Sequence, residues 1–280
     1  MKTILHATDF SENAIEALKY AHTLCLKMNA SLYVIHVFDT STLSSDLNET
    51  YLLPFKETLE QKNKKLKQFC ETHLGSNYKT TQLKMSAVEH KNVAKGIISK
   101  VKEINASIIV TGAKGKSALE ELLTGNTIKQ LIEKAPCPVL IIPKHTKLQK
   151  LETIVYATDF EEEDISAIFK LSQIAKIFNA TIKVVHVSSK KETHGLQEME
   201  WFKELLKQKV TYEKLEFDLL FYEDTYDVLK AYLEEANADL LAMLEREKKN
   251  ILKKIFHRDL VKKMGSKSTI PLISYNEVNY

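Results

Sequence analysis

Apolar residues along the first half of the chain alternate between short continuous runs and longer segments in which they recur every three or four positions. The first kind predicts buried strands, and the second predicts helices that bury one face. The strand-like runs are ILHAT from Ile4, SLYVIHV from Ser31 and SIIVTG from Ser107. Ser11 precedes the first helical segment and is its expected N-cap. The apolar stripe of that segment consists of Ala14, Leu18, Ala21, Cys25 and Met28.

The pattern predicts further elements beyond these. We expect helices over residues 54–73 and 88–105 and from Asn126 onward, and strands over residues 78–85 and 138–143, the last with the sequence PVLIIP. Strands that alternate with helices in this way are typical of a parallel sheet that is covered on both faces and has right-handed crossovers. The sequence therefore predicts an α/β fold of the doubly wound type.

The second half of the chain repeats the first. The segment Thr3–Val37 aligns without a gap to Thr153–Val187, and both contain Ala-Thr-Asp-Phe near the start and His-Val at the end. This self-similarity predicts two tandem domains of one fold, which we place at residues 1–146 and 147–280. Two shorter matches support it, Asn105–Ile109 with Asn237–Leu241 and Cys137–Ile141 with Ile270–Ile273.

Composition narrows the class of protein. Of the 280 residues, 44% are hydrophobic and 28% charged, which is ordinary for a globular protein. The net charge of +3 divides into +6 for residues 1–147 and −3 for residues 148–280, and neither value favours nucleic-acid binding. The start of the chain does not resemble a signal peptide, and no apolar run is long enough to span a membrane. We therefore expect a cytoplasmic protein. Cys25, Cys70 and Cys137 lack the spacing of a metal site.

Three of the seven glycines of the chain lie in the stretch TGAKGKSALEELLTGNT, which begins at Thr111. A Walker loop would need a glycine five residues before Gly115, but that residue is Val110, so the Walker interpretation fails. The glycines can instead expose backbone N–H groups to a phosphate chain, and Gly125-Asn126-Thr127 opens a helix whose N-terminus favours an anion. The alternative is two ordinary turns followed by a helix cap.

The sequence resembles the universal stress protein family over essentially its whole length, as two tandem domains. The resemblance rests on ATDFSEN from Ala7, VIHV from Val34 and the spacing Gly-x2-Gly-x9-Gly-Asn-Thr. It implies a sheet of order 3-2-1-4-5 in each domain, and ATP bound at the glycine motif with the adenine between an aspartate and a valine. The residues implied are Asp9, Val37, Gly112, Gly115, Gly125, Asn126 and Thr127.

The residues themselves support the same location. Asp9, Val37 and Gly112 each end a predicted strand at its carboxyl edge, where open α/β sheets bind ligands. An aspartate can accept a hydrogen bond from an amine or a ribose hydroxyl, although Asp9 can equally cap the helix that follows. Lys116 can neutralise phosphate charge, or it is a solvated loop lysine. Ser117 and Thr124 are secondary candidates, as is Mg²⁺ beside the ATP.

The second copy lacks the glycine motif. Leu244 stands in the place of Gly112 and Glu247 in the place of Gly115, while Asp159 and Val187 persist. We expect that this domain does not bind ATP in the same manner, because side chains fill the backbone approach and Glu245 and Glu247 repel phosphate. Two charged segments are interpreted as solvated: Glu161–Asp164 at a helix start, rather than a metal site, and the lysines of 248–254, rather than an anion site. His257-Arg258 is a weaker candidate for an anion or partner contact.

Three functions fit these residues. The leading hypothesis is a stress-response protein that uses ATP, or a related adenine nucleotide, as a regulatory ligand read by a protein partner. The alternatives are a slow ATPase or phosphotransferase and a scaffold without ligand. No clear catalytic base is present, because His36 recurs as His186 and is interpreted as structural, and His6 is one histidine on a strand. The resemblance also implies pairing through the last strands, and the apolar runs PVLIIP and IPLISY are the candidate edge strands for it. We therefore expect the two domains to form an intrachain pseudo-dimer, with a homodimer of two chains as a further alternative.

Overall fold

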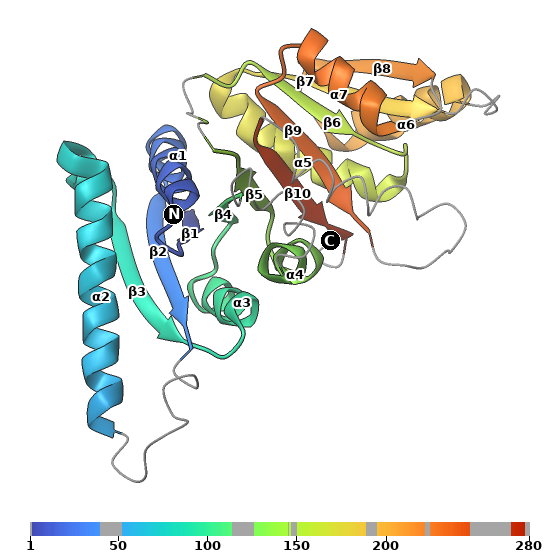
Figure 1. Cartoon of the computed structure of the whole chain (residues 1–280). Helices are drawn as coiled ribbons and strands as arrows, with labels where there is room; N and C mark the ends of the chain where they lie inside the picture. Colours follow the sequence, from blue (N-terminus) through green and yellow to red (C-terminus); the bar gives the residue numbers. More distant parts are fainter. Residues whose placement is uncertain are drawn as a thin grey trace. The chain divides into compact units, whose positions relative to one another are not determined.

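The chain divides into two compact units, Met1–Lys147 and Leu148–Tyr280, each built around a parallel sheet (Figure 1). The computed structural model describes residues 2–39, 52–113, 126–144, 146, 150–188, 195–221, 225–246 and 270–277. None of the helices in these ranges has both the length and the hydropathy that a membrane span requires.

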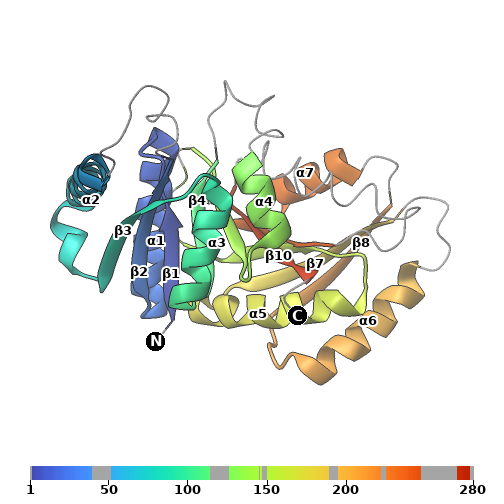
Figure 2. The ribbon, with the colours of Figure 1, turned by 90° about the horizontal axis from the view of Figure 1, so that it is seen from below.

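Unit 1 contains five parallel strands in the order β3-β2-β1-β4-β5, which confirms the predicted 3-2-1-4-5. Helices α1 and α2 pack on one face of the sheet, and α3 and α4 lie side by side on the other (Figure 2). The strands are β1 (Thr3–Ala7), β2 (Ser31–Phe38), β3 (Leu83–Glu89), β4 (Ile108–Gly112) and β5 (Val139–Ile142). The helices are α1 (Glu12–Met28), α2 (Leu52–Leu74), α3 (Val93–Ile104) and α4 (Asn126–Lys134), with a 3₁₀ helix at Gly75–Lys79.

Unit 2 repeats this arrangement in the order β8-β7-β6-β9-β10. Helices α5 and α6 pack against each other on one face, and α7 contacts β7. The strands are β6 (Thr153–Ala157), β7 (Thr181–Ser188), β8 (Leu215–Phe221), β9 (Leu240–Glu245) and β10 (Leu272–Asn276). The helices are α5 (Glu162–Phe178), α6 (Gly195–Lys209) and α7 (Thr225–Glu235).

Helices in both units end at an asparagine that is followed closely by the next strand. Asn29 and Asn179 end α1 and α5 in the left-handed conformation, with φ of 49° and 57°, and their N–H groups bond the last carbonyls of the helix. Asn105 ends α3 in the same way, with φ of 50°. Asparagine tolerates this conformation better than most residues and turns the chain directly into the next strand. The recurrent Asn-Ala of the sequence is therefore a helix terminator.

Two predicted boundaries in unit 1 are wrong. The strand expected at 78–85 is β3 at Leu83–Glu89, and the helix expected at 88–105 begins only at Val93. The side chain of Asn92 accepts a hydrogen bond from the N–H of Lys95 (2.9 Å), so the capping residue sets the helix start. Val88 and Glu89, which the pattern assigns to the helix, continue the strand instead, in register with Val37 and Phe38.

Gly112 lies where the sheet meets helix α1. A Cβ at this position would lie 2.5 Å from the backbone oxygen of Asn13 and 3.0 Å from the nitrogen of Ala14. The glycine is therefore required by the close approach of β4 to the start of α1, in addition to any role at a ligand. Strand register places Leu244 at the same position of unit 2, because Ala7 pairs with Thr111 and Ala157 with Met243.

Substitution of Gly112 by alanine should destabilise unit 1. Because the new methyl group meets backbone atoms, the helix or strand has to shift, and the expected loss is about 1–3 kcal/mol of unfolding free energy. Urea denaturation followed by circular dichroism measures it. Gly195→Ala is the control, since its nearest contact would be the movable Leu219 side chain at 3.3 Å. Equal, small effects of both changes would contradict the packing argument.

Candidate functional site

A cleft of about 360 Å³ opens in unit 1 at the carboxyl edge of the sheet. It lies where the strand order reverses, between β1 and β4, the position at which open α/β sheets bind ligands. Five of the residues predicted from the sequence line it together: Asp9, Val37, Gly112, Asn126 and Thr127. The remaining predicted residues, Gly115, Lys116 and Gly125, and the secondary candidates Ser117 and Thr124, lie outside the described residues.

The loop that follows β1 holds Asp9 in place by short-range hydrogen bonds. Asp9 accepts a bond from the N–H of Ser11 through Oδ1 (3.0 Å), and Thr8 Oγ1 accepts one from the N–H of Phe10 (3.0 Å). Ser11 is the N-cap of α1, as predicted, with its hydroxyl accepting from the N–H of Ala14. Asp9 is thus exposed and tied to the loop through one oxygen, rather than being the cap itself.

Apolar side chains form one wall of the cleft. Ile35 and Val37 come from β2, and Val93 and Ile97 come from the first turns of α3. Gly96 lets α3 approach closely, since a Cβ there would lie 2.8 Å from Val37 Cγ1. This wall can bury a flat apolar group, while the strand ends beside it offer backbone polar groups.

The start of α4 forms the opposite part of the lining. Asn126 and Thr127 are its first residues, where the N–H groups have no partner within the helix and the dipole is positive. Gln130 donates to Asn126 Oδ1 (2.6 Å) and accepts from Asn92 Nδ2 (3.2 Å), which ties this helix start to the cap of α3. Asn92 and Gln130 position the site without lining it, and the sequence pattern did not reveal them.

The two histidines considered as bases do not line the cleft. His36 donates from Nδ1 to the carbonyl of Thr8 (2.9 Å), and burial lowers its pKa, so the neutral ring holds the loop. His6 is fully buried and bonds the carbonyl of Val110 through Nδ1 (3.1 Å). Burial lowers the pKa of His6 to about 4. Among the described lining residues, Asp9 is the one titratable group.

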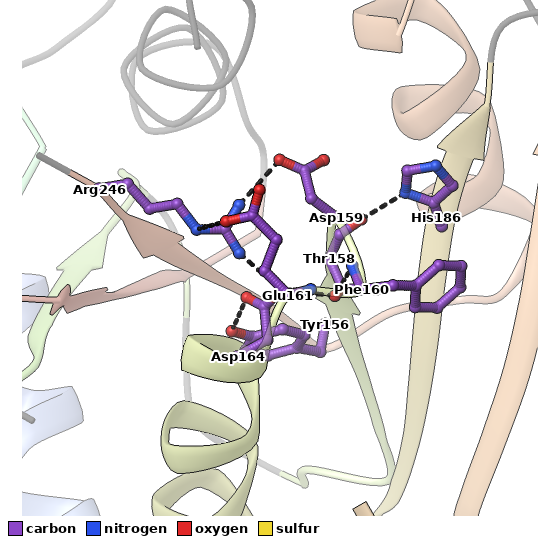
Figure 3. Close-up of polar contacts among 8 residues, drawn as sticks. All are labelled: Tyr156, Thr158, Asp159, Phe160, Glu161, Asp164, His186 and Arg246. Atoms are coloured by element: carbon purple, nitrogen blue, oxygen red, sulfur yellow. Dashed lines mark hydrogen bonds and ion pairs between the residues drawn. The ribbon is translucent and has the colours of Figure 1, made fainter. Parts of the chain in front are cut away.

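The corresponding loop of unit 2 keeps the same framework. Thr158 Oγ1 accepts from the N–H of Phe160 (2.8 Å), and His186 Nδ1 donates to the carbonyl of Thr158 (2.8 Å) (Figure 3). Phe160 and its counterpart Phe10 both have positive φ, 57° and 67°. The structural interpretation of both histidines, as holders of the loop after the first strand, therefore agrees with these contacts.

Unit 2 differs in what faces this loop. The guanidinium of Arg246, the residue after β9, donates to Asp159 Oδ2 (2.8 Å) and to Asp164 Oδ2 (2.6 Å), and its Nε lies 3.5 Å from a carboxylate oxygen of Glu161 (Figure 3). Burial alone would lower the pKa of Arg246, but the three carboxylates outweigh it and raise that pKa. Asp159, the counterpart of Asp9, is thus engaged by a side chain of its own unit.

The expectation that the start of α5 is solvated is wrong for Asp164. The segment Glu161–Asp164 was interpreted as a solvated helix start, but the Asp164 side chain is only 1% exposed. It accepts bonds from the hydroxyls of Tyr156 and Thr158, both at 2.7 Å, in addition to Arg246. Burial, with Asp164 beside it, raises the pKa of Tyr156 well above its usual value. Among the described residues, no group of His, Cys, Asp or Glu side chains is arranged to hold a metal ion.

A signal for this cluster was present in the sequence. Asp164 aligns with Ala14, the first residue of the apolar stripe of α1, and a charge at a core position requires a partner. Arg246 aligns, by strand register, with Lys114 at the edge of the glycine motif. Both charged residues of the Asp164–Arg246 pair are therefore visible in the repeat alignment, although the sequence does not show that they are in contact.

A larger hollow, of about 570 Å³, lies between α5 and α6 in unit 2. Ile165, Phe169 and Leu205 are among its lining residues, and all of the lining belongs to these two helices. None of its described lining residues comes from a strand end, in contrast to the cleft of unit 1. We therefore assign the candidate site to the smaller cleft.

Comparison with known proteins identifies relatives of the chain. The sequence model of the universal stress protein family matches residues 1–143. A universal stress protein of Methanocaldococcus jannaschii is 30% identical over 150 residues, which cover 52% of this chain and 84% of that protein. A putative universal stress protein of Staphylococcus aureus strain USA300 is 33% identical over 148 residues, 50% of this chain and 83% of its own length.

A solved structure resembles the fold of the whole chain. A universal stress protein from Archaeoglobus fulgidus matches with a TM-score of 0.71 over 98% of both chains, at 17% sequence identity. At that identity the likeness concerns the fold alone. It includes both tandem units, as the sequence repeat predicts.

Burial of His6 predicts a pH dependence of stability. Its folded-state pKa of about 4 lies below the ordinary 6.5, so the unfolded chain binds the proton more tightly. The contribution of His6 is fully present above pH 6.5 and is lost as the pH falls toward 4, at about 3 kcal/mol in total. Urea denaturation of the wild type and of His6→Gln across this range measures it. The variant should show the flatter profile, whereas parallel profiles would contradict the assignment.

Proposed function

The chain belongs to the universal stress protein family, and on that premise we propose that its first unit binds an adenine nucleotide as a regulatory ligand. ATP is the first candidate, with ADP, AMP or a cyclic nucleotide as related ligands. The observation that carries this proposal is the convergence of Asp9, Val37, Gly112, Asn126 and Thr127 on one cleft. These residues come from the loop after β1 and from three separate elements, β2, β4 and α4, so the convergence is a property of the fold and not of sequence proximity.

The chemistry of the lining suits both ends of a nucleotide. The apolar wall of Val37, Val93 and Ile97 can cover a planar base, and the exposed carboxylate of Asp9 can accept from an amine or a ribose hydroxyl. The start of α4 offers N–H groups and a positive dipole end to phosphate oxygens. The volume of about 360 Å³ falls in the usual range of small-molecule sites.

A regulatory role is favoured over rapid turnover. Hydrolysis requires an oriented water and charge stabilisation at the terminal phosphate in addition to a phosphate cradle. The two candidate histidines bond backbone carbonyls and lie outside the lining. A ligand that contacts both the loop after β1 and the start of α4 can instead favour one arrangement of these elements, and a protein partner can read that difference.

Substitution of Thr127 by glutamate should weaken nucleotide binding at least tenfold. The new carboxylate would face phosphate at the start of α4, yet an acidic residue in the first turn does not destabilise a helix. Isothermal titration with ATP measures the affinity. Lys129→Gln is the matched control, because it changes the net charge by the same amount on the same helix but outside the lining.

Identification of any nucleotide released from the purified, denatured protein complements this titration. About one adenine nucleotide per chain is expected, and ADP in place of ATP would indicate turnover. Absence of both a released nucleotide and ATP binding in titration would overturn the proposal. Equal loss of affinity in Thr127→Glu and Lys129→Gln would place the ligand elsewhere.

A further inference from the structure

The two units differ in what lies at the reversal of strand order. In each, the strand order reverses between the first and fourth strands, so the loops that leave these strands diverge over a crevice. In unit 1 the crevice is the cleft beside Asp9. In unit 2, Arg246 extends from the end of β9 to the loop after β6 and to the first turn of α5 (Figure 3).

The contacts of Arg246 have the character of a ligand site. Its guanidinium forms two hydrogen bonds to two different carboxylates, and the side chain is only 5% exposed. One of these carboxylates, Asp164, is saturated by donors from Tyr156, Thr158 and Arg246, so it is built to receive a cation rather than left over from packing. The other, Asp159, corresponds to the carboxylate that faces the cleft in unit 1.

The residues that differ between the two units around the crevice contact one another in unit 2. Unit 1 has alanine at position 14, which lines the cleft, where unit 2 has the buried Asp164. Unit 1 has histidine at position 6 where unit 2 has Tyr156, whose hydroxyl donates to Asp164. At both positions, the residue of unit 2 carries a polar group that contacts the guanidinium or its carboxylate.

We propose that Arg246 is the built-in occupant of the second site: its guanidinium fills a cation subsite formed by Asp159, Glu161 and Asp164 and ties the end of β9 to the loop after β6. The crevice of unit 2 is thereby always filled by a side chain of the same unit. The ligand class of this subsite is a guanidinium cation, supplied in cis. Any response to a soluble ligand then belongs to unit 1, a consequence that rests on the function proposed above, whereas the occupancy of the second site by Arg246 does not.

Removal of the side chain tests the proposal. Arg246→Ala should lower the melting temperature of unit 2 by about 10 °C or more, because it leaves the buried carboxylate of Asp164 without its cation. Trp201, the one tryptophan of the chain, lies in α6 and reports on this unit by fluorescence. Lys183→Ala is the control, since it breaks the Lys183–Glu216 ion pair, in which Glu216 is 54% exposed, and should change the melting temperature by a few degrees at most.

Rescue by a soluble guanidinium separates a site from a merely structural residue. Millimolar methylguanidinium chloride should restore part of the lost melting temperature in Arg246→Ala and none in the wild type or in Lys183→Ala. The rescue should vanish in Arg246→Ala/Asp164→Asn, which lacks a subsite carboxylate. Absence of any rescue in Arg246→Ala, or equal rescue in the double variant, would overturn the assignment.

The double variant also keeps the test decisive if Arg246→Ala does not fold. Because Asp164→Asn removes the unpaired charge, the double variant should be more stable than Arg246→Ala alone, whereas independent residues would give additive losses. Additive losses would contradict the proposal. The fluorescence signal comes from unit 2, so a failure of nucleotide binding in unit 1 would leave this result unaffected.

Discussion

The crevice created by parallel pairing at the reversal of strand order is the constraint on which the rest of each unit depends. Pairing of β1 with β4, and of β6 with β9, sends the following loops to opposite faces of the sheet. Strand ends and helix starts converge there, and the first N–H groups of a helix have no partner within the helix itself. A cleft opens there in unit 1, whereas Arg246 crosses the same place in unit 2.

The hydrogen bonds that hold the loop beside the crevice are the same in both units. The repeated residues that form them therefore have a structural role. Thr8 and Thr158 accept from the residue two positions later, and His36 and His186 hold the carbonyls of these threonines. The recurrence of His-Val in a unit without the glycine motif fits this role. The threonine and the histidine that occur in both copies hold the loop, whereas the occupant of the crevice differs with positions such as Ala14 and its counterpart Asp164.

The sequence predicted the fold and five of the residues that line the cleft of unit 1. Apolar periodicity and the repeat sufficed for the strands, the helices and the two units, because burial of strands and helix faces is a local pattern. The order of the strands in the sheet followed only from the family resemblance. The start of α3 was missed because one capping bond, from Lys95 to Asn92, overrides the apolar pattern before it. Arg246 was missed because its partners lie more than 80 positions away, and only strand register brings them together.

The two solutions cannot be exchanged by single substitutions. An aspartate at position 14 alone would bury a carboxylate without a cation, and an arginine after β4 alone would extend into a cleft with no carboxylate at position 14. Loss of one partner from a buried pair costs about 3–5 kcal/mol, a large share of the stability of a domain of this size. Leu244 adds a further barrier, since its counterpart Gly112 has no room for a Cβ beside Asn13. A single substitution would therefore be destabilising in either direction, whether it removes the internal cation from unit 2 or introduces one into the cleft of unit 1.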